Sequence, residues 1–141
     1  MSKAESKGIQ AAPLEDDLFV WNACIIGPEN TPYQEGTFEL EIKFPSKYPV
    51  EPPKVNFITP IFHPNVYTTG EVCLDILEEK QWNPMLSIEA ILISVQNLLG
   101  DPYFHSAANT EASELLAKYP KMFNNYVESM IAKQNLEAEQ E

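Results

Sequence analysis

Cys73 is the side chain of this sequence best suited to covalent chemistry. It stands in residues 63–77, HPNVYTTGEVCLDIL, shortly after Gly70. A thiolate is a strong nucleophile and can hold an acyl group as a thioester. Cys24, the other cysteine, lies in an apolar run, where cysteine is usually a small core residue. Taken alone, Cys73 fits a structural role as well as a functional one.

Asn65 stands eight residues before Cys73 and strengthens the functional interpretation. When an amine attacks a thioester, negative charge develops on the carbonyl oxygen, and one amide donor aimed at that oxygen is worth about 3 kcal/mol. Asparagine also holds its own loop through backbone hydrogen bonds. The two roles can coexist.

His63 raises the alternative of a Cys–His hydrolase, in which an imidazole draws the proton from the sulfur. Pro64 follows directly and stiffens the turn, which suits a histidine that fixes the loop at least as well as a mobile base. His105 is the other candidate base, and it fits a solvated loop residue equally well.

The elements that must position these side chains change halfway along the chain. Eight of the twelve prolines lie between Pro28 and Pro64, which excludes long helices there. Residues 18–27, 37–44 and 54–58 have the composition or alternation of strands. Residues 59–84 show no periodicity, and a long irregular segment inside a domain often carries function.

Helical spacing dominates the second half. Apolar residues from Ile88 to Leu99 predict a helix with Ser87 as its cap and Gly100 as its stop. A second helix is predicted over residues 109–119 and a third after Pro120, with a frayed acidic end. Antiparallel strands followed by helices indicate an α+β fold.

Composition restricts the class of protein. The 141 residues are 44% hydrophobic and 21% charged, as in a single globular domain. Nine lysines, no arginine and 21 acidic residues give a net charge of −12, which argues against nucleic acid and anionic membranes as partners.

Cysteine and histidine spacing predicts neither a disulfide framework nor a metal site, and we expect a reducing compartment. The start, MSKAESKGIQ, has no apolar signal region, and no apolar run approaches the roughly 18 residues of a membrane helix. The predicted location is cytoplasmic or nuclear.

The residues around Cys73 resemble the active-site segment of ubiquitin-conjugating enzymes. HPN, the cysteine within CLDIL, and then Trp82 and Pro84 carry the resemblance. FVWNACIIGPENTPYQEGTFELEIKFPSKYPVEPPKVNF is similar to the family's sheet, and QNLLGDPYFHSAANTEA to the segment after its central helix. The resemblance covers residues 13–130 and implies an antiparallel four-stranded sheet with helices packed on one side and end.

The resemblance implies that Cys73 accepts the ubiquitin C-terminus from an activating enzyme, and that a ligase promotes transfer to a substrate lysine. No cofactor is needed at this step, because ATP is consumed upstream. Asn65 would stabilise the oxyanion or the loop that shapes it. Asp75 would lie close to the thioester or cap a helix or loop.

The acceptor lysine, with a pKa near 10.4, is almost wholly protonated at neutral pH and must be desolvated or oriented. Many family members place Asp, Glu or Ser where Ser106 stands. Ser106 would hydrogen-bond the amine without adding charge, or serve as a plain loop hydroxyl. Tyr103 and His105 are close enough in sequence to contribute.

Two partner surfaces follow by position. Val50, Pro84 and Met85 match the ligase-contact loops and are apolar, as a docking patch requires. Ile93 and Asn97 match positions that touch the donor ubiquitin, although Ile93 also fits ordinary core packing.

The resemblance is incomplete at the N-terminus, where family members carry a basic helix. Only twelve residues precede Pro13, with Gly8 among them, so that helix is predicted to be missing or reduced. The predicted division is a tail or helix remnant over residues 1–12, the catalytic core over 13–134 and an acidic end over 135–141. There is no long acidic insertion between Cys73 and Trp82.

Two alternatives stay open beside the active conjugating enzyme. The reduced N-terminus leaves room for an uncharged scaffold that binds ubiquitin or a ligase. Another ubiquitin-like modifier could also be the cargo.

Overall fold

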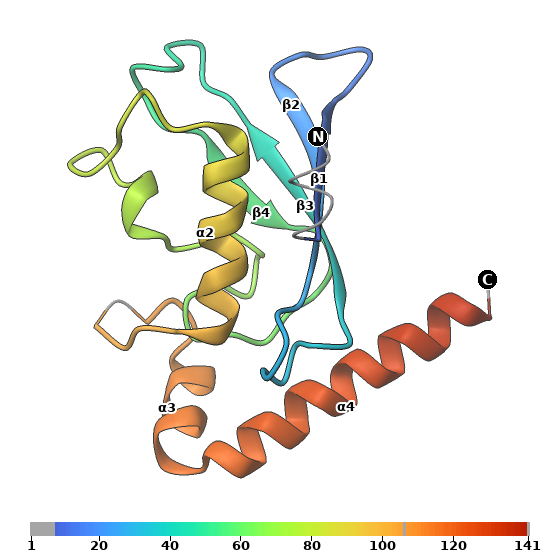
Figure 1. Cartoon of the computed structure of the whole chain (residues 1–141). Coiled ribbons are helices and arrows are strands. Elements are labelled where there is room, and N and C mark those ends of the chain that lie inside the picture. Colours follow the sequence, from blue (N-terminus) through green and yellow to red (C-terminus); the bar gives the residue numbers. More distant parts are fainter. Residues whose placement is uncertain (1–7, 106, 141) are drawn as a thin grey trace.

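The chain folds as an antiparallel sheet with helices against one face and one end (Figure 1). A computed structural model describes residues 8–105 and 107–140. The strands β1 (Ile9–Pro13), β2 (Val20–Ile26), β3 (Thr37–Lys43) and β4 (Lys54–Phe57) lie side by side in chain order. Each neighbouring pair is antiparallel. The predicted α+β fold with a four-stranded antiparallel sheet is confirmed.

Alternate side chains of the sheet point into the core, as the period of a strand requires. In β3, Phe38, Leu40 and Ile42 are buried. In β2, Ala23 and Ile25 are buried, whereas Cys24 between them is half-buried on the opposite face. The interpretation of Cys24 as a core residue was therefore wrong, because its position in the alternation turns it outward.

The first strand corrects the predicted boundary at Pro13. Residues 9–12 belong to the sheet, where Ile9 pairs with Ile25 and Ala12 with Asn22. Ile9 is fully buried and Ala11 is half-buried on the same face. Two inward residues are too few for the sequence pattern to distinguish a strand from a tail. Residues 1–7, the rest of the predicted tail or helix remnant, lie outside the described residues.

Helix α2 (Ile88–Gly100) crosses the buried face of the sheet (Figure 1). The Ser87 hydroxyl accepts a hydrogen bond from the Ala90 N–H at 3.0 Å, so the predicted cap is confirmed. The helix ends at Gly100, as predicted. Its buried face consists of Ile91, Leu92, Val95, Leu98 and Leu99.

Helices α3 (Thr110–Lys118) and α4 (Pro120–Glu139) close one end of the sheet (Figure 1). Residues 135–139, predicted to fray, continue α4. The Gln134 and Asn135 amides donate to the carbonyls of Pro60 and Glu35, which ties this part of the helix to the body of the fold. No described helix is long and apolar enough to cross a bilayer.

Between β4 and α2 the chain is largely irregular, as predicted. Its regular parts are the 3-10 helix η1 (Asp75–Leu77) and two isolated bridges, Asn56 with Glu71 and Val66 with Val72. This connection carries Cys73.

Candidate active site around Cys73

The segment before Cys73 is bonded along β4. The Phe57 N–H donates to the Gly70 carbonyl at 2.8 Å, and the Val72 N–H donates to the Val55 carbonyl at 3.0 Å. Gly70 has φ +101°, and a Cβ there would stand 2.3 Å from the Phe57 oxygen. A glycine is needed because both the backbone conformation and the close approach exclude a side chain.

His63 is fully buried and holds the start of this segment. Its Nε2 lies 2.8 Å from the Leu98 carbonyl in α2, and its Nδ1 accepts the Asn65 N–H at 2.9 Å. Because a carbonyl can only accept, the ring hydrogen lies on Nε2. Burial lowers the pKa of His63 to about 4.

A neutral imidazole with both nitrogens engaged has no lone pair for the Cys73 proton. His63 therefore fixes the loop, and the structure gives no support to a Cys–His hydrolase built on it. His105 is exposed and stacks on Tyr103, with 4.5 Å between the ring centroids.

Asn65 is fully buried and bonds to Tyr103 through both atoms of its amide. Its Nδ2 donates to the Tyr103 carbonyl at 2.8 Å, and its Oδ1 accepts the Tyr103 N–H at 3.1 Å. Its main-chain carbonyl accepts the Cys73 N–H at 2.8 Å. These bonds establish the loop-holding role of Asn65, while its oxyanion role stays a prediction.

Cys73 is half-buried at the edge of a hollow of about 510 Å³. Burial raises the pKa of its thiol, a hydrogen bond with the Tyr103 side chain lowers it, and the charges of Glu78, Asp75 and Glu71 raise it further. The thiol therefore keeps its proton more readily than a free cysteine. Cys73 is one of the residues that line this hollow, together with Glu71 and Glu78.

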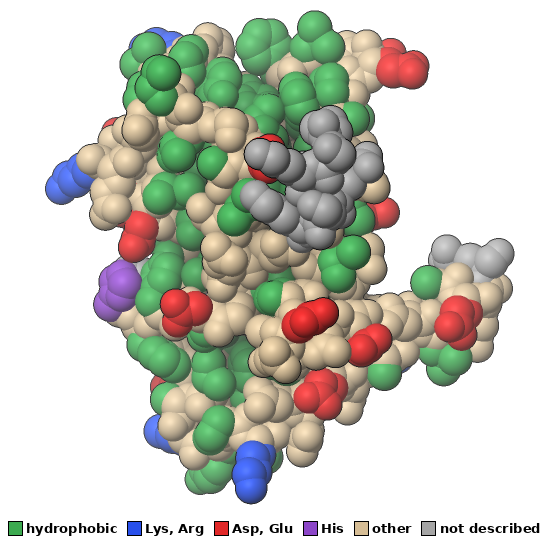
Figure 2. Space-filling model, in the orientation of Figure 1, with side chains coloured by type: hydrophobic (Ala, Val, Ile, Leu, Met, Phe, Trp, Pro, Cys, Tyr) green, Lys and Arg blue, Asp and Glu red, His purple; other side chains and the backbone are tan. Residues whose placement is uncertain are grey.

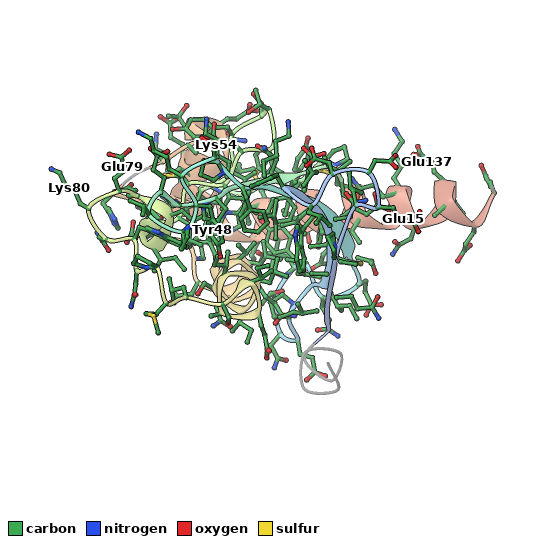
Figure 3. The ribbon with its side chains drawn as sticks, turned by 90° about the horizontal axis from the view of Figure 1, so that it is seen from above. Glu15, Tyr48, Lys54, Glu79, Lys80 and Glu137 are labelled. Atoms are coloured by element: carbon green, nitrogen blue, oxygen red, sulfur yellow. The ribbon has the colours of Figure 1, made fainter. Side chains whose placement is uncertain are left out.

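The hollow beside Cys73 is lined by both positively and negatively charged side chains. Lys54 of β4 and Glu79 of the loop after η1 both line it and lie toward the same end of the molecule, with Lys80 projecting further outward (Figure 3). Within residues 8–105 and 107–140, no three His, Cys, Asp or Glu side chains are arranged to hold a metal ion.

The remaining predicted catalytic residues are placed unequally. Asp75 is the first residue of η1, two positions after Cys73, and its charge acts on the thiol. Ser106 lies outside the described residues. Tyr103 is the residue whose contact with Cys73 the sequence did not reveal, because its ring reaches the cysteine over a separation of 30 residues.

The predicted ligase-contact residues lie on two loops that are bonded to each other. Val50 is 76% exposed and Met85 88% exposed, and Pro84 is also exposed. The Trp82 indole N–H donates to the Pro49 carbonyl at 2.7 Å, which ties the two loops together. Hydrophobic side chains gather over these loops at the upper left of Figure 2.

The predicted ubiquitin-contact residues lie one turn apart on α2. Asn97 is exposed, and Ile93 is half-buried with part of its side chain against the core. Ile93 thus contributes to packing and still presents some surface.

Comparison with known proteins identifies a family that agrees with this fold. The family described as "Ubiquitin-conjugating enzyme" matches residues 1–131. "Ubiquitin-conjugating enzyme E2 2" of Fusarium solani is 47% identical over 126 residues, which cover 89% of this chain and 83% of that protein. The protein of the same name from Saccharomyces cerevisiae is 44% identical over 133 residues, covering 94% and 77%.

The chain belongs to the ubiquitin-conjugating enzyme family, a class of enzymes that transfer ubiquitin. Membership implies three general partners: ubiquitin, an activating enzyme and a ligase.

The buried His63 predicts acid sensitivity. Its folded-state pKa, about 4, lies below its ordinary value of 6.5, so its contribution to stability is complete above 6.5 and is lost as pH falls toward 4. Moving from about pH 7.5 to about pH 5 should remove about 2 kcal/mol of unfolding free energy through this residue.

Urea unfolding at both pH values measures the effect. The His63→Gln variant should lose this part of the pH dependence, whereas His105→Gln, which removes an exposed imidazole, should keep it. Equal pH dependence in wild type and His63→Gln would contradict the assignment.

Proposed function

We propose that Cys73 carries ubiquitin as a thioester and passes it to a lysine amine with the help of a ligase. In charging, the Cys73 thiol gives up its proton and its sulfur attacks the thioester carbonyl on the activating enzyme. A new C–S bond forms, the old C–S bond breaks, and the proton ends on the activating enzyme's departing thiolate. In discharge, the lysine nitrogen attacks the same carbonyl. An amide forms and the Cys73 thiol is released.

The observation that carries the proposal is the placement of Cys73. Its main chain is held by Asn65, while its side chain stands half-buried beside an open hollow. A cysteine that must meet two successive protein substrates needs a route from solvent. Cys24 is half-buried too, and the main-chain bond to Asn65 is what sets Cys73 apart from it.

The charges around the sulfur support an amine as the acceptor. Glu71, Asp75 and Glu78 all disfavour a thiolate at Cys73. The same carboxylates attract a lysine ammonium, which must approach before it loses its proton. Asp75 begins η1 two positions after Cys73, and we assign it this electrostatic role beside the thioester.

Replacement of Cys73 tests the carrier role. With activating enzyme, ubiquitin and ATP, the wild type should form an adduct that thiols cleave on a gel. Cys73→Ala should abolish the adduct, and Cys73→Ser should give an oxyester that thiols do not cleave. Parallel reactions with other ubiquitin-like modifiers determine the cargo.

Cys24→Ala is the matched control, because it removes the other thiol from the far face of the sheet and should charge normally. An adduct that survives Cys73→Ala would refute the assignment. Absence of an adduct with every modifier would favour the uncharged scaffold.

We further propose that Asn65, besides holding the loop, stabilises the oxyanion formed when the amine attacks. The role is supported by the bond from Cys73 to the Asn65 carbonyl, which keeps the two residues adjacent. An amide donor should matter more in discharge than in charging. In discharge the nucleophile is a neutral amine, so the negative charge on the carbonyl oxygen is newly created.

Asn65→Ala should slow discharge onto free lysine by about a hundredfold and charging by much less. Asn109→Ala is the matched control, since Asn109 is also buried but caps α3 through the Ala112 N–H. Both variants should lose about 1–3 kcal/mol of stability. Equal slowing of charging and discharge in Asn65→Ala would reduce Asn65 to a structural residue.

Val50, Pro84 and Met85 form the surface that we assign to the ligase. The Val50→Ser, Met85→Ser double variant should charge normally. With a ligase that is active on the wild type, its rate of discharge should be about tenfold lower than that of the wild type. Leu136→Ser, an exposed position on α4, is the control. Unchanged stimulation by every such ligase would place the contact elsewhere.

Donor ubiquitin is assigned to Ile93 and Asn97 of α2, and Ser106 to the approach of the lysine. These two assignments, and a cytoplasmic or nuclear location, stay predictions.

A further inference from the structure

Tyr103 touches the candidate active site with both of its ends. Its main-chain N–H and carbonyl are bonded to the Asn65 amide. Its hydroxyl donates to the Cys73 carbonyl, so it stands at the residue whose thiol pKa a hydrogen bond with the Tyr103 side chain lowers. The residue comes three positions after α2, in a different part of the sequence from the other two.

The three residues close a ring of hydrogen bonds. Cys73 donates its N–H to Asn65, Asn65 bonds the main chain of Tyr103, and the Tyr103 hydroxyl returns to Cys73. Each member is therefore positioned by the other two. The exposed His105 ring stacks against Tyr103 and restricts its remaining freedom.

The Tyr103 hydroxyl is suited to donate rather than to accept a proton. Burial raises its pKa above the ordinary phenol value, and the negative charges of Cys73 and Asp75 raise it further. It therefore keeps its hydrogen at neutral pH. It is also the group beside the sulfur that favours a thiolate, in opposition to the three carboxylates.

We propose that Tyr103 is a positioning residue for transfer, which holds Cys73 against Asn65 through the bond to the Cys73 carbonyl and turns its one hydroxyl hydrogen from that carbonyl to the sulfur whenever the sulfur is an anion. This role rests on the proposed function, in which Cys73 is the nucleophile. The sulfur is anionic twice in the cycle, as the nucleophile of charging and as the leaving group of discharge. One donor serves both steps.

Other charges around the sulfur must be kept constant in any test. Those that act on the thiol are Glu71, Asp75 and Glu78, and the further titratable side chains lining the hollow are Lys43, Glu51, Lys54, Tyr67 and Glu79. Tyr103→Phe leaves all of them in place. It also keeps the aromatic ring and the main-chain bonds to Asn65, so the fold should persist.

The test is the pH profile of Cys73 alkylation by iodoacetamide in a Cys24→Ala background, where Cys73 is the remaining thiol. Tyr103→Phe should raise the apparent pKa of Cys73 by about one pH unit. Charging at neutral pH should slow by about threefold, because the thiolate becomes scarcer but more nucleophilic. Tyr67→Phe makes the same chemical change beside the same hollow and should leave the profile unchanged.

An unchanged profile in Tyr103→Phe would overturn the inference. If that variant fails to fold, 3-fluorotyrosine at position 103 keeps the ring and is a stronger donor, so it should lower the Cys73 pKa; no shift would again overturn the inference. Alkylation needs no ubiquitin. A wild type that never charges would thus refute the proposed function while the Tyr103 contact is still measured.

Discussion

The buried amide of Asn65 is the contact on which the arrangement around Cys73 depends. An irregular segment packed against a helix and a sheet leaves backbone polar groups that must find partners away from water. The Asn65 side-chain amide bonds to the N–H and the carbonyl of Tyr103, and the Asn65 main-chain carbonyl accepts the Cys73 N–H. The His63 ring likewise bonds to the Asn65 N–H and to the Leu98 carbonyl of α2. Satisfying these groups fixes where the sulfur stands.

The electrostatics of the site follow from this placement. A half-buried thiol surrounded by carboxylates resists ionisation, so the protein does not rely on a resting thiolate. The same carboxylates attract a cationic acceptor. Of the two histidines, the buried His63 has both ring nitrogens engaged and cannot act as a base for the thiol.

Local signals identified most of the elements. The side-chain oxygens of Ser87 and Asn109 each cap a helix by accepting a hydrogen bond from the N–H three residues later. This spacing can be recognised in the sequence. Alternation in β3 predicted its buried face. The alternation was too short to reveal β1, where only two residues point inward. No local signal marked the end of α4, whose Gln134 and Asn135 amides donate to the carbonyls of Pro60 and Glu35.

The sequence by itself determined the fold class, the irregular connection and the choice of Cys73, because periodicity, capping residues and a motif within about a dozen positions are local properties. Only the tertiary structure decided that His63 is neutral and fully engaged and that Tyr103 reaches Cys73. It also decided that Trp82 joins the loops of Val50 and Met85. Those outcomes depend on contacts between residues some 30 positions apart, which no local pattern encodes.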